Sequence, residues 1–298
     1  RNFLVLKEDK VRLARYLASG ASSPAVGIID DNDNVAEIHG SGGDLGTLLL
    51  LDKESLGKVA DTSIKKHKLS DVRLLAPIGS PGKILALAGN YHPHNSLRDV
   101  DVDIEVPQFF IKPRTALIGP DEEIPNTNGT STLNTIEEIE LGVIIGKPGK
   151  DISLSDAYDH VFGYTVVNDF SGRDLNLHPD RDPSHWIEWL NGKWLDGFCP
   201  AGPWIVVAED VADPTNLQVT TKINGDIRVD GNTSRMLFDI PHQIAYISRL
   251  TTLEPGDMIC TGVVPLPDNQ DDEVYIKSGD VIEGTVEGVG TLSNTIGK

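Results

Sequence analysis

The chain has 298 residues, of which 39% are hydrophobic and 24% are charged, and its formal net charge is −19. This composition predicts one large globular domain or two of about 150 residues each, and it excludes a chain that is disordered throughout. A strongly acidic surface repels phosphates and anionic lipids, so neither nucleic acid nor membrane is expected as a partner.

The two cysteines, Cys199 and Cys260, are too few for a disulfide framework and favour a reducing compartment. We interpret Cys199 as a packed thiol and not as a nucleophile. No stretch approaches the roughly 20 apolar residues of a membrane span. Charged residues interrupt the first ten positions, so no secretory signal is visible there and the cytoplasm is the expected location.

Residues 1–78 are predicted to form a small N-terminal β-rich domain. Residues 30–34 form a turn cluster, and the glycine-rich stretch 40–46 is interpreted as a loop, because its third glycine is out of register for a dinucleotide-binding motif. The Pro- and Gly-rich stretch 77–83 predicts a junction. Residues 79–298 then form the second domain.

Short apolar runs dominate the second domain and predict strands over 84–88, 109–111, 141–145, 164–167 and 204–207. Apolar residues alternate over 217–223 and lead into Asn224-Gly225, a strong hairpin signal. A helix is predicted after Asp239, which can cap it, and a smaller helix over 155–160. Since residues 281–296 alternate again, the predicted fold class is mixed and mostly β.

Glu138 and Glu140 carry the first functional signal, because they alternate just before the apolar run of 141–145. Side chains two positions apart on a strand point to the same face, so the two carboxylates are expected to lie together. Burying such a pair is costly unless a divalent cation offsets the charge, and carboxylates suit Mg²⁺ or Mn²⁺. The alternative is an exposed edge strand with solvated glutamates.

Further polar motifs follow in a fixed order along the chain. They are Gly-Asn-Tyr-His-Pro-His at 89–94, Pro-Gln-Phe-Phe-Ile-Lys-Pro at 107–113, Asn-Asp-Phe-Ser-Gly-Arg-Asp at 168–174, Asn-Gly-Lys at 191–193 and Thr-Gly-Val-Val at 261–264. Together with Glu-Ile-Glu-Leu at 138–141, this combination resembles the fumarylacetoacetate hydrolase superfamily from about residue 82 to the end. The resemblance implies a catalytic domain built on a rolled β-sheet.

The resemblance also implies roles for individual residues. Glu138, Glu140 and Asp169 would bind the metal, Lys193 would contact substrate, and His94 on a lid would act as general base. Such a set leaves about three of six coordination positions open for water and substrate. Four further residues are predicted to bind substrate: Lys112, Arg173, Asn176 and Thr261. Simpler alternatives remain open, namely an ion pair between Arg173 and Asp174, a plain strand-end Lys112, and a metal pair of His92 and His94.

Three departures from the family pattern bear on the reaction. Hydrolytic members usually carry Glu three residues after the lid histidine, where this chain has Leu97. The family's glutamine after the Arg-Asp pair is Asn176 here. Its Thr-Pro pair after Thr-Gly is Val263-Val264, which removes a donor for a carboxylate and predicts a substrate whose far end is neutral.

The function predicted from the sequence is a Mg²⁺- or Mn²⁺-dependent hydrolase, with Ca²⁺ as a substitute in crystals, that cleaves a C–C bond of a 2,4-dioxo acid. In such an enzyme the metal acts as a Lewis acid on the 2-oxo group. The alternatives are a decarboxylase, isomerase or dehydratase of a 2-oxo acid, and a degraded relative that only binds metal and ligand. The expected partners are a small anionic 2-oxo or 2,4-dioxo acid and, as in the family, a second copy in a homodimer.

Overall fold

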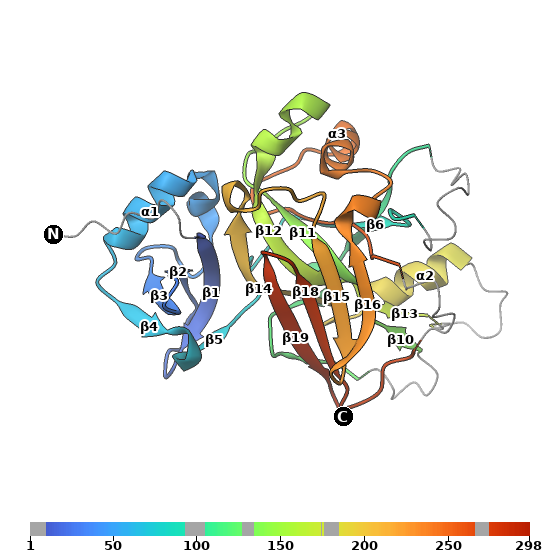
Figure 1. Ribbon diagram of the computed structural model, residues 1–298, viewed down its shortest axis with the longest axis horizontal. Coiled ribbons are helices and arrows are strands. Elements are labelled where there is room, and N and C mark those ends of the chain that lie inside the picture. The colour runs from blue at the N-terminus through green and yellow to red at the C-terminus, as the bar shows by residue number, and fades with distance from the viewer. Residues whose placement is uncertain (1–9, 93–104, 127–133, 174, 176–184, 266–273) are drawn as a thin grey trace.

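The computed structural model describes residues 10–92, 105–126, 134–173, 175, 185–265 and 274–298. Figure 1 shows a smaller N-terminal lobe, which carries α1 (Lys53–Asp61), beside a larger C-terminal lobe. The architecture is mixed and mostly β, as predicted. The C-terminal lobe is built on sheets that pack face to face over apolar residues.

The largest sheet of the described part of the chain has 12 strands and runs through both lobes. Its main path is β4-β3-β2-β1-β14-β12-β11-β17-β6-β7, with β5 on β1 and β8 on β14. The strands are β1 (Arg12–Ala18), β2 (Ala25–Ile29), β3 (Asn34–Glu37), β4 (Lys66–Lys68), β5 (Val72–Leu74), β6 (Ile84–Ala88), β7 (Gln108–Lys112), β8 (Leu117–Ile118), β11 (Ile139–Ile145), β12 (Val161–Asn168), β14 (Cys199–Val207) and β17 (Met258–Cys260).

The N-terminal lobe is joined to the rest by strand pairing, because Arg12 and Leu13 of β1 lie opposite Val206 and Ile205 of β14. The turn predicted over 30–34 connects β2 and β3. The glycine-rich stretch is a loop over 40–45, and its last residue, Gly46, begins a short 3₁₀ helix. The domain boundary at residue 78 stays a prediction.

Strand β11 lies at the centre of the C-terminal lobe. It pairs with β12 on one side and with β17 on the other, and all seven of its residues are buried. The exposed edge strand considered for the glutamate pair is therefore wrong. A strand with neighbours on both sides holds its side chains in a fixed register, so the residues at its beginning are placed firmly.

A second sheet packs against the first and has the order β16-β15-β18-β19-β9. Asn224 and Gly225 both adopt positive φ angles, 53° and 89°, which confirms the predicted hairpin turn between β15 and β16. Gly284 lets this sheet approach β11, since an added Cβ would lie 2.2 Å from Ile139. The strands are β9 (Glu123–Ile124), β15 (Gln218–Ile223), β16 (Asp226–Asn232), β18 (Val281–Val286) and β19 (Gly290–Ile296), and a separate pair is formed by β10 (Thr135–Ile136) and β13 (Ser171–Gly172).

The helix predicted after Asp239 is α3 (Ile240–Leu250), and the Asp239 side chain accepts a hydrogen bond from the backbone of His242. The smaller predicted helix is a 3₁₀ helix over Leu154–His160. Two helices were not predicted, α1 and α2 (His185–Lys193). Further 3₁₀ turns are Gly46–Leu50, Leu69–Asp71, Arg114–Ala116, Ala208–Asp210 and Thr233–Arg235. None of the described helices has the length and apolar character needed to span a membrane.

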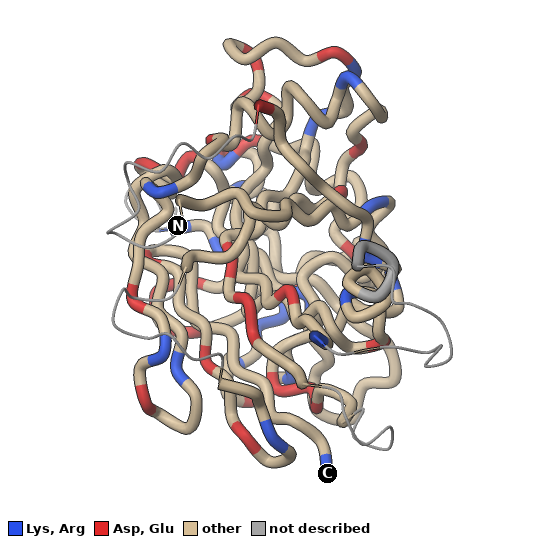
Figure 2. Tube along the Cα trace, turned by 90° about the vertical axis from the view of Figure 1, so that its right-hand side faces the viewer, with Lys and Arg blue, Asp and Glu red and all other residues tan. Residues whose placement is uncertain are grey.

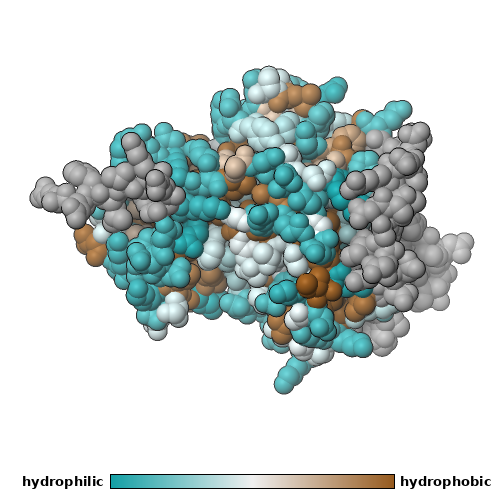
Figure 3. Space-filling model, in the orientation of Figure 1, coloured by the Kyte–Doolittle hydropathy of each residue, from teal (hydrophilic) through white to brown (hydrophobic). Residues whose placement is uncertain are grey.

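Acidic and basic positions are interspersed along the chain and not gathered in one block (Figure 2). The face shown in Figure 3 is mainly hydrophilic, with small scattered apolar patches. Cys199 and Cys260 are both buried and free, in agreement with packed thiols.

Candidate functional site

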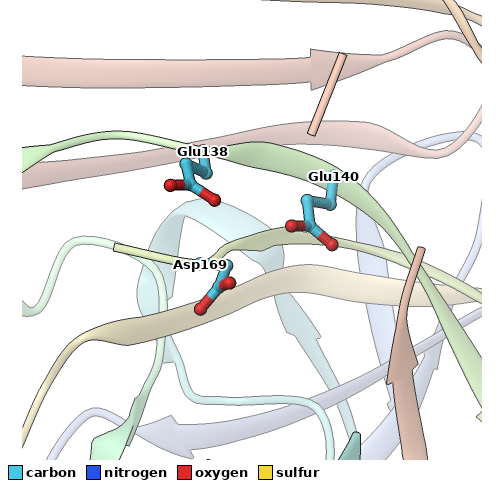
Figure 4. Close-up of side chains that lie close together, drawn as sticks. All are labelled: Glu138, Glu140 and Asp169. Atoms are coloured by element: carbon cyan, nitrogen blue, oxygen red, sulfur yellow. The ribbon is translucent and has the colours of Figure 1, made fainter. Parts of the chain in front are cut away.

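Three carboxylates meet at the start of β11. Glu140 lies on this strand and Glu138 directly precedes it. Asp169 directly follows the end of the neighbouring β12. One carboxylate oxygen of each lies within 4.8 Å of the others, and Figure 4 shows the three groups turned toward one another. A single ion could contact all three at this spacing.

Backbone contacts between the two strands fix this arrangement. The backbone N–H of Glu138 donates to Oδ1 of Asn168 at 2.9 Å, and the backbone N–H of Asp169 donates to the carbonyl of Glu138 at 2.8 Å. Because these contacts link the two chain segments at the site itself, the carboxylates do not depend on flexible loops for their position.

Two buried lysines neutralise part of this negative charge. Lys193, the last residue of α2, donates to Oε2 of Glu138 at 2.8 Å and to Oδ2 of Asp169 at 2.7 Å. Lys112 donates to the other oxygen of Asp169 at 2.5 Å. Burial by itself raises the pKa of Asp169, but the two ammonium groups outweigh it and hold that pKa below its ordinary value. Asp169 is therefore ionised in the folded protein.

Glu140 is in the opposite electrostatic situation. Its Oε2 accepts from the backbone of Gly262 at 2.7 Å, whereas its Oε1 is buried and has no hydrogen-bond partner. Burial first, and then the charges of Asp169 and Glu138, raise the pKa of Glu140 well above its ordinary value. An orphaned carboxylate oxygen beside two other carboxylates is the environment that a divalent cation would complete, so these residues fit Mg²⁺ or Mn²⁺.

The other predicted residues fall into two groups. Arg173 lies beside the cluster, with Nη2 3.9 Å from Oε1 of Glu138. The hydroxyl of Thr261 donates to the carbonyl of Leu141 at 3.0 Å, which uses its only donor hydrogen. Lys112 contacts Asp169, as described above. His94 and Asn176 lie outside the described residues, so their roles stay predictions.

A pocket of about 140 Å³ opens beside Glu138. Its polar lining consists of Glu137, Glu138, Arg173 and Arg228, and its apolar wall includes Val263. This volume lies below the roughly 300–1,000 Å³ of sites for drug-sized ligands, so the pocket suits a small acid.

Two residues of the pocket lining, Glu137 and Arg228, are not among the site residues predicted from the sequence. Burial raises the pKa of Glu137 to about 7, although the guanidinium of Arg228 opposes this shift. Glu137 adjoins Glu138 but belongs to none of the sequence motifs that indicate the site. Arg228 is at least 33 residues from every predicted site residue, and no local pattern links it to them.

Known proteins are similar to this chain over most of its length. Residues 83–297 match the family model described as "Fumarylacetoacetate (FAA) hydrolase C-terminal". The chain is 34% identical over 295 residues to the mitochondrial oxaloacetate tautomerase fahd2 of Xenopus laevis, which covers 96% of this chain and 90% of the relative. It is 40% identical over 234 residues to the oxaloacetate tautomerase YisK of Bacillus subtilis strain 168, which covers 78% of this chain and 75% of the relative.

Among solved structures, the chain is similar to maleylpyruvate hydrolase of Sphingobium sp. SYK-6 in complex with manganese(II) and pyruvate. The TM-score is 0.74 and the identity is 29%, with 96% of this chain and 100% of the other covered. This chain is thus similar both to relatives named tautomerase and to a solved structure named hydrolase, so similarity alone does not select between the two reactions.

Proposed function

Because this chain belongs to the fumarylacetoacetate hydrolase family, we propose that it is a Mg²⁺- or Mn²⁺-dependent tautomerase that interconverts the enol and keto forms of oxaloacetate. The support comes from two relatives named oxaloacetate tautomerase, one of them matched over 96% of this chain. The buried cluster of Glu138, Glu140 and Asp169 supplies the acidic site that such an enzyme needs. The proposed reaction is the isomerase alternative, and not the hydrolysis predicted first from the sequence.

The observation that carries the choice of reaction is the residue at position 97. Hydrolysis requires an activated water, and in hydrolytic members a glutamate orients the lid histidine for this purpose. This chain has Leu97 at that position, which can neither accept nor donate a hydrogen bond. Tautomerisation needs no attacking water, because only one proton moves between the oxygen on C2 and carbon C3.

The residues around the carboxylate cluster would bind the substrate and stabilise the negative charge that develops on its C2 oxygen. When bound, the divalent ion would act as a Lewis acid on the C2 oxygen. Lys193 places a buried ammonium group at the cluster, where it would stabilise negative charge that develops on this oxygen. Arg173 lies at the same end of the pocket as Glu138 and would help to hold the C1 carboxylate.

The proton balance of the reaction is simple. In the direction from enol to keto, the O–H proton leaves, its electron pair forms the C2=O bond, and the former C2=C3 pair accepts a proton at C3. His94 is the residue we propose for this transfer, since an unperturbed imidazole pKa near 6.5 allows it to accept and donate protons near neutral pH.

The test follows the disappearance of enol absorbance after the oxaloacetate enol is mixed with the protein. Mn²⁺-loaded protein should accelerate tautomerisation, and chelation of the metal or Glu138→Gln should abolish the acceleration. His94→Ala should lower the rate by about 10²–10⁴. No acceleration by the metal-loaded wild type would refute the proposed function.

Hydrolysis is the second candidate, favoured by the likeness to the manganese- and pyruvate-bound maleylpyruvate hydrolase. Acetylpyruvate separates the two, because a hydrolase releases pyruvate and acetate from it whereas a tautomerase only changes its enol content. The homodimer expected from the family stays a prediction, which sedimentation of the purified protein would test.

A further inference from the structure

Arg228 occupies an irregular position in the second sheet. On β15, Thr221 lies opposite Val229 and Lys222 lies opposite Ile227, so that Arg228 is an extra residue of β16 with no partner position across the ladder. Such a bulge turns a side chain out of the regular alternation, and bulges are common beside active sites. Here the bulge brings the half-buried Arg228 into the pocket next to Glu138.

The strand that carries Arg228 is held firmly against the pocket wall. Gly231, three residues further along β16, leaves room for Val264, since a Cβ at this glycine would lie 2.2 Å from Cγ1 of Val264. Val264 is 1% exposed, and Val229 beside the arginine is 5% exposed. A side chain anchored on a packed strand is oriented in advance, which lowers the entropy cost of binding a ligand.

A substrate with two carboxylates needs a second cation in this pocket, apart from the one at the metal end. Arg173 lies beside Glu138, at the metal end. Arg228 and Glu137 line the same pocket, whose lining includes neither of the cluster's lysines. In a protein with a net charge of −19, the second carboxylate of a dianionic substrate would meet Glu137 and an apolar wall unless a guanidinium received it.

We propose that Arg228 is the specificity-determining residue that binds the C4 carboxylate of the substrate, and that it selects a dicarboxylic 2-oxo acid over one with a neutral end. The planar guanidinium can donate two parallel hydrogen bonds to a carboxylate, and the apolar wall of Val229, Val263 and Val264 strengthens such a contact. This inference rests on the proposed function. It replaces the neutral far end predicted from Val263-Val264, because the donor lost there is supplied from β16.

The experiment compares oxaloacetate with acetylpyruvate, in which a methyl group replaces one carboxylate oxygen at C4. Dissociation constants of both are measured at equilibrium on the Mn²⁺-loaded full-length protein, by displacement of oxalate followed by calorimetry. The variants are Arg228→Gln, Arg228→Lys and, as a control for the loss of one exposed positive charge, Arg249→Gln on α3. Oxalate binding and the thermal unfolding of each variant report whether the site is intact.

Arg228→Gln should weaken oxaloacetate binding by about 10- to 150-fold and leave acetylpyruvate and oxalate unchanged. Arg228→Lys should recover part of the loss, and Arg249→Gln should have no effect. Equal losses for both ligands, or no loss for oxaloacetate, would overturn the assignment. Because these are binding measurements, they read the role of Arg228 even if the wild type proves to hydrolyse acetylpyruvate, a result that would refute only the proposed reaction.

Discussion

The ammonium nitrogen of Lys193 lies 2.7 Å from Oδ2 of Asp169, and each of these residues is only 1% exposed. Either charge alone would be costly at this depth, so each depends on the other. Burial opposes the charged form of Lys193, but Asp169 and Glu138 outweigh it and raise the pKa of this lysine. The two carboxylates therefore favour the charged form of Lys193 in the metal-free protein.

Lys193→Met should lower the unfolding free energy of the metal-free protein by about 3–5 kcal/mol, because Glu138 loses its ammonium partner and Asp169 keeps only that of Lys112. Added Mn²⁺ should restore part of this loss, since the ion supplies positive charge to the same oxygens. Urea denaturation in the presence of a chelator and of Mn²⁺ measures both effects. Lys147→Met, which removes an exposed lysine, is the control, and a loss no larger than in this control would contradict the prediction.

Glu140→Gln should have opposite effects on stability and on metal binding. The orphaned, buried carboxylate oxygen destabilises the metal-free protein, so a neutral amide should stabilise it by about 1–3 kcal/mol. The same change should also weaken Mn²⁺ binding. Loss of a residue that only hydrogen-bonds to a metal ligand costs roughly 10- to 100-fold in affinity, and loss of the ligand itself should cost more. Thermal unfolding and calorimetric titration measure the two quantities, with Glu123→Gln on the exposed part of β9 as control. Unchanged Mn²⁺ affinity would remove Glu140 from the metal site.

Gly192→Ala should displace the helix that carries Lys193. An added Cβ would lie 2.0 Å from the carbonyl oxygen of Gly172, and backbone cannot move aside cheaply. We expect a loss of stability of about 1–3 kcal/mol, as in other overpacked sites, together with weaker activity because Lys193 shifts with α2. Asn191→Ala on the same helix is the matched control. Wild-type stability and activity in Gly192→Ala would show that α2 does not depend on this close approach.

Glu37 should make the stability of the N-terminal lobe dependent on acid pH. It accepts from Lys65 at 2.7 Å and contacts His67 at 3.3 Å, and although burial opposes this, the hydrogen bond from Lys65 leads in lowering its pKa below 4.5. A carboxyl with a lowered folded-state pKa stabilises the protein above the unfolded-state value, and this contribution disappears as the pH falls through the folded-state value.

The measurement is the difference in melting temperature between wild type and Glu37→Gln across the acid range. The wild type should be more stable near neutral pH, and the difference should shrink below about pH 4.5 as Glu37 takes up a proton. Glu54→Gln, which removes an exposed carboxyl of α1, should show little change. A difference that stays constant or grows toward low pH would show that Glu37 acts only through packing.

The sequence was sufficient wherever a feature depends on neighbouring residues. Glu138 and Glu140 are two positions apart at the start of β11, and their shared direction follows from the period of a strand. Asn224-Gly225 sets the hairpin turn because both residues tolerate positive φ angles. Asp239 caps α3 through a contact only three residues away. Such features need no knowledge of the rest of the chain.

Contacts between distant segments determined those features of the site that local sequence patterns do not predict. The ammonium group of Lys112 binds Asp169, which is 57 residues further on, and no local pattern predicts this contact. Helix α2 has no strong local signal, and Gly192 fits only because the backbone of Gly172 passes directly beneath it. Arg228 reaches the pocket through a bulge. The position of a bulge depends on how two strands align across the sheet, and packing of β16 against Val264 helps to fix that alignment. A local pattern contains no such information, because the energy that selects the alignment arises only when the segments meet.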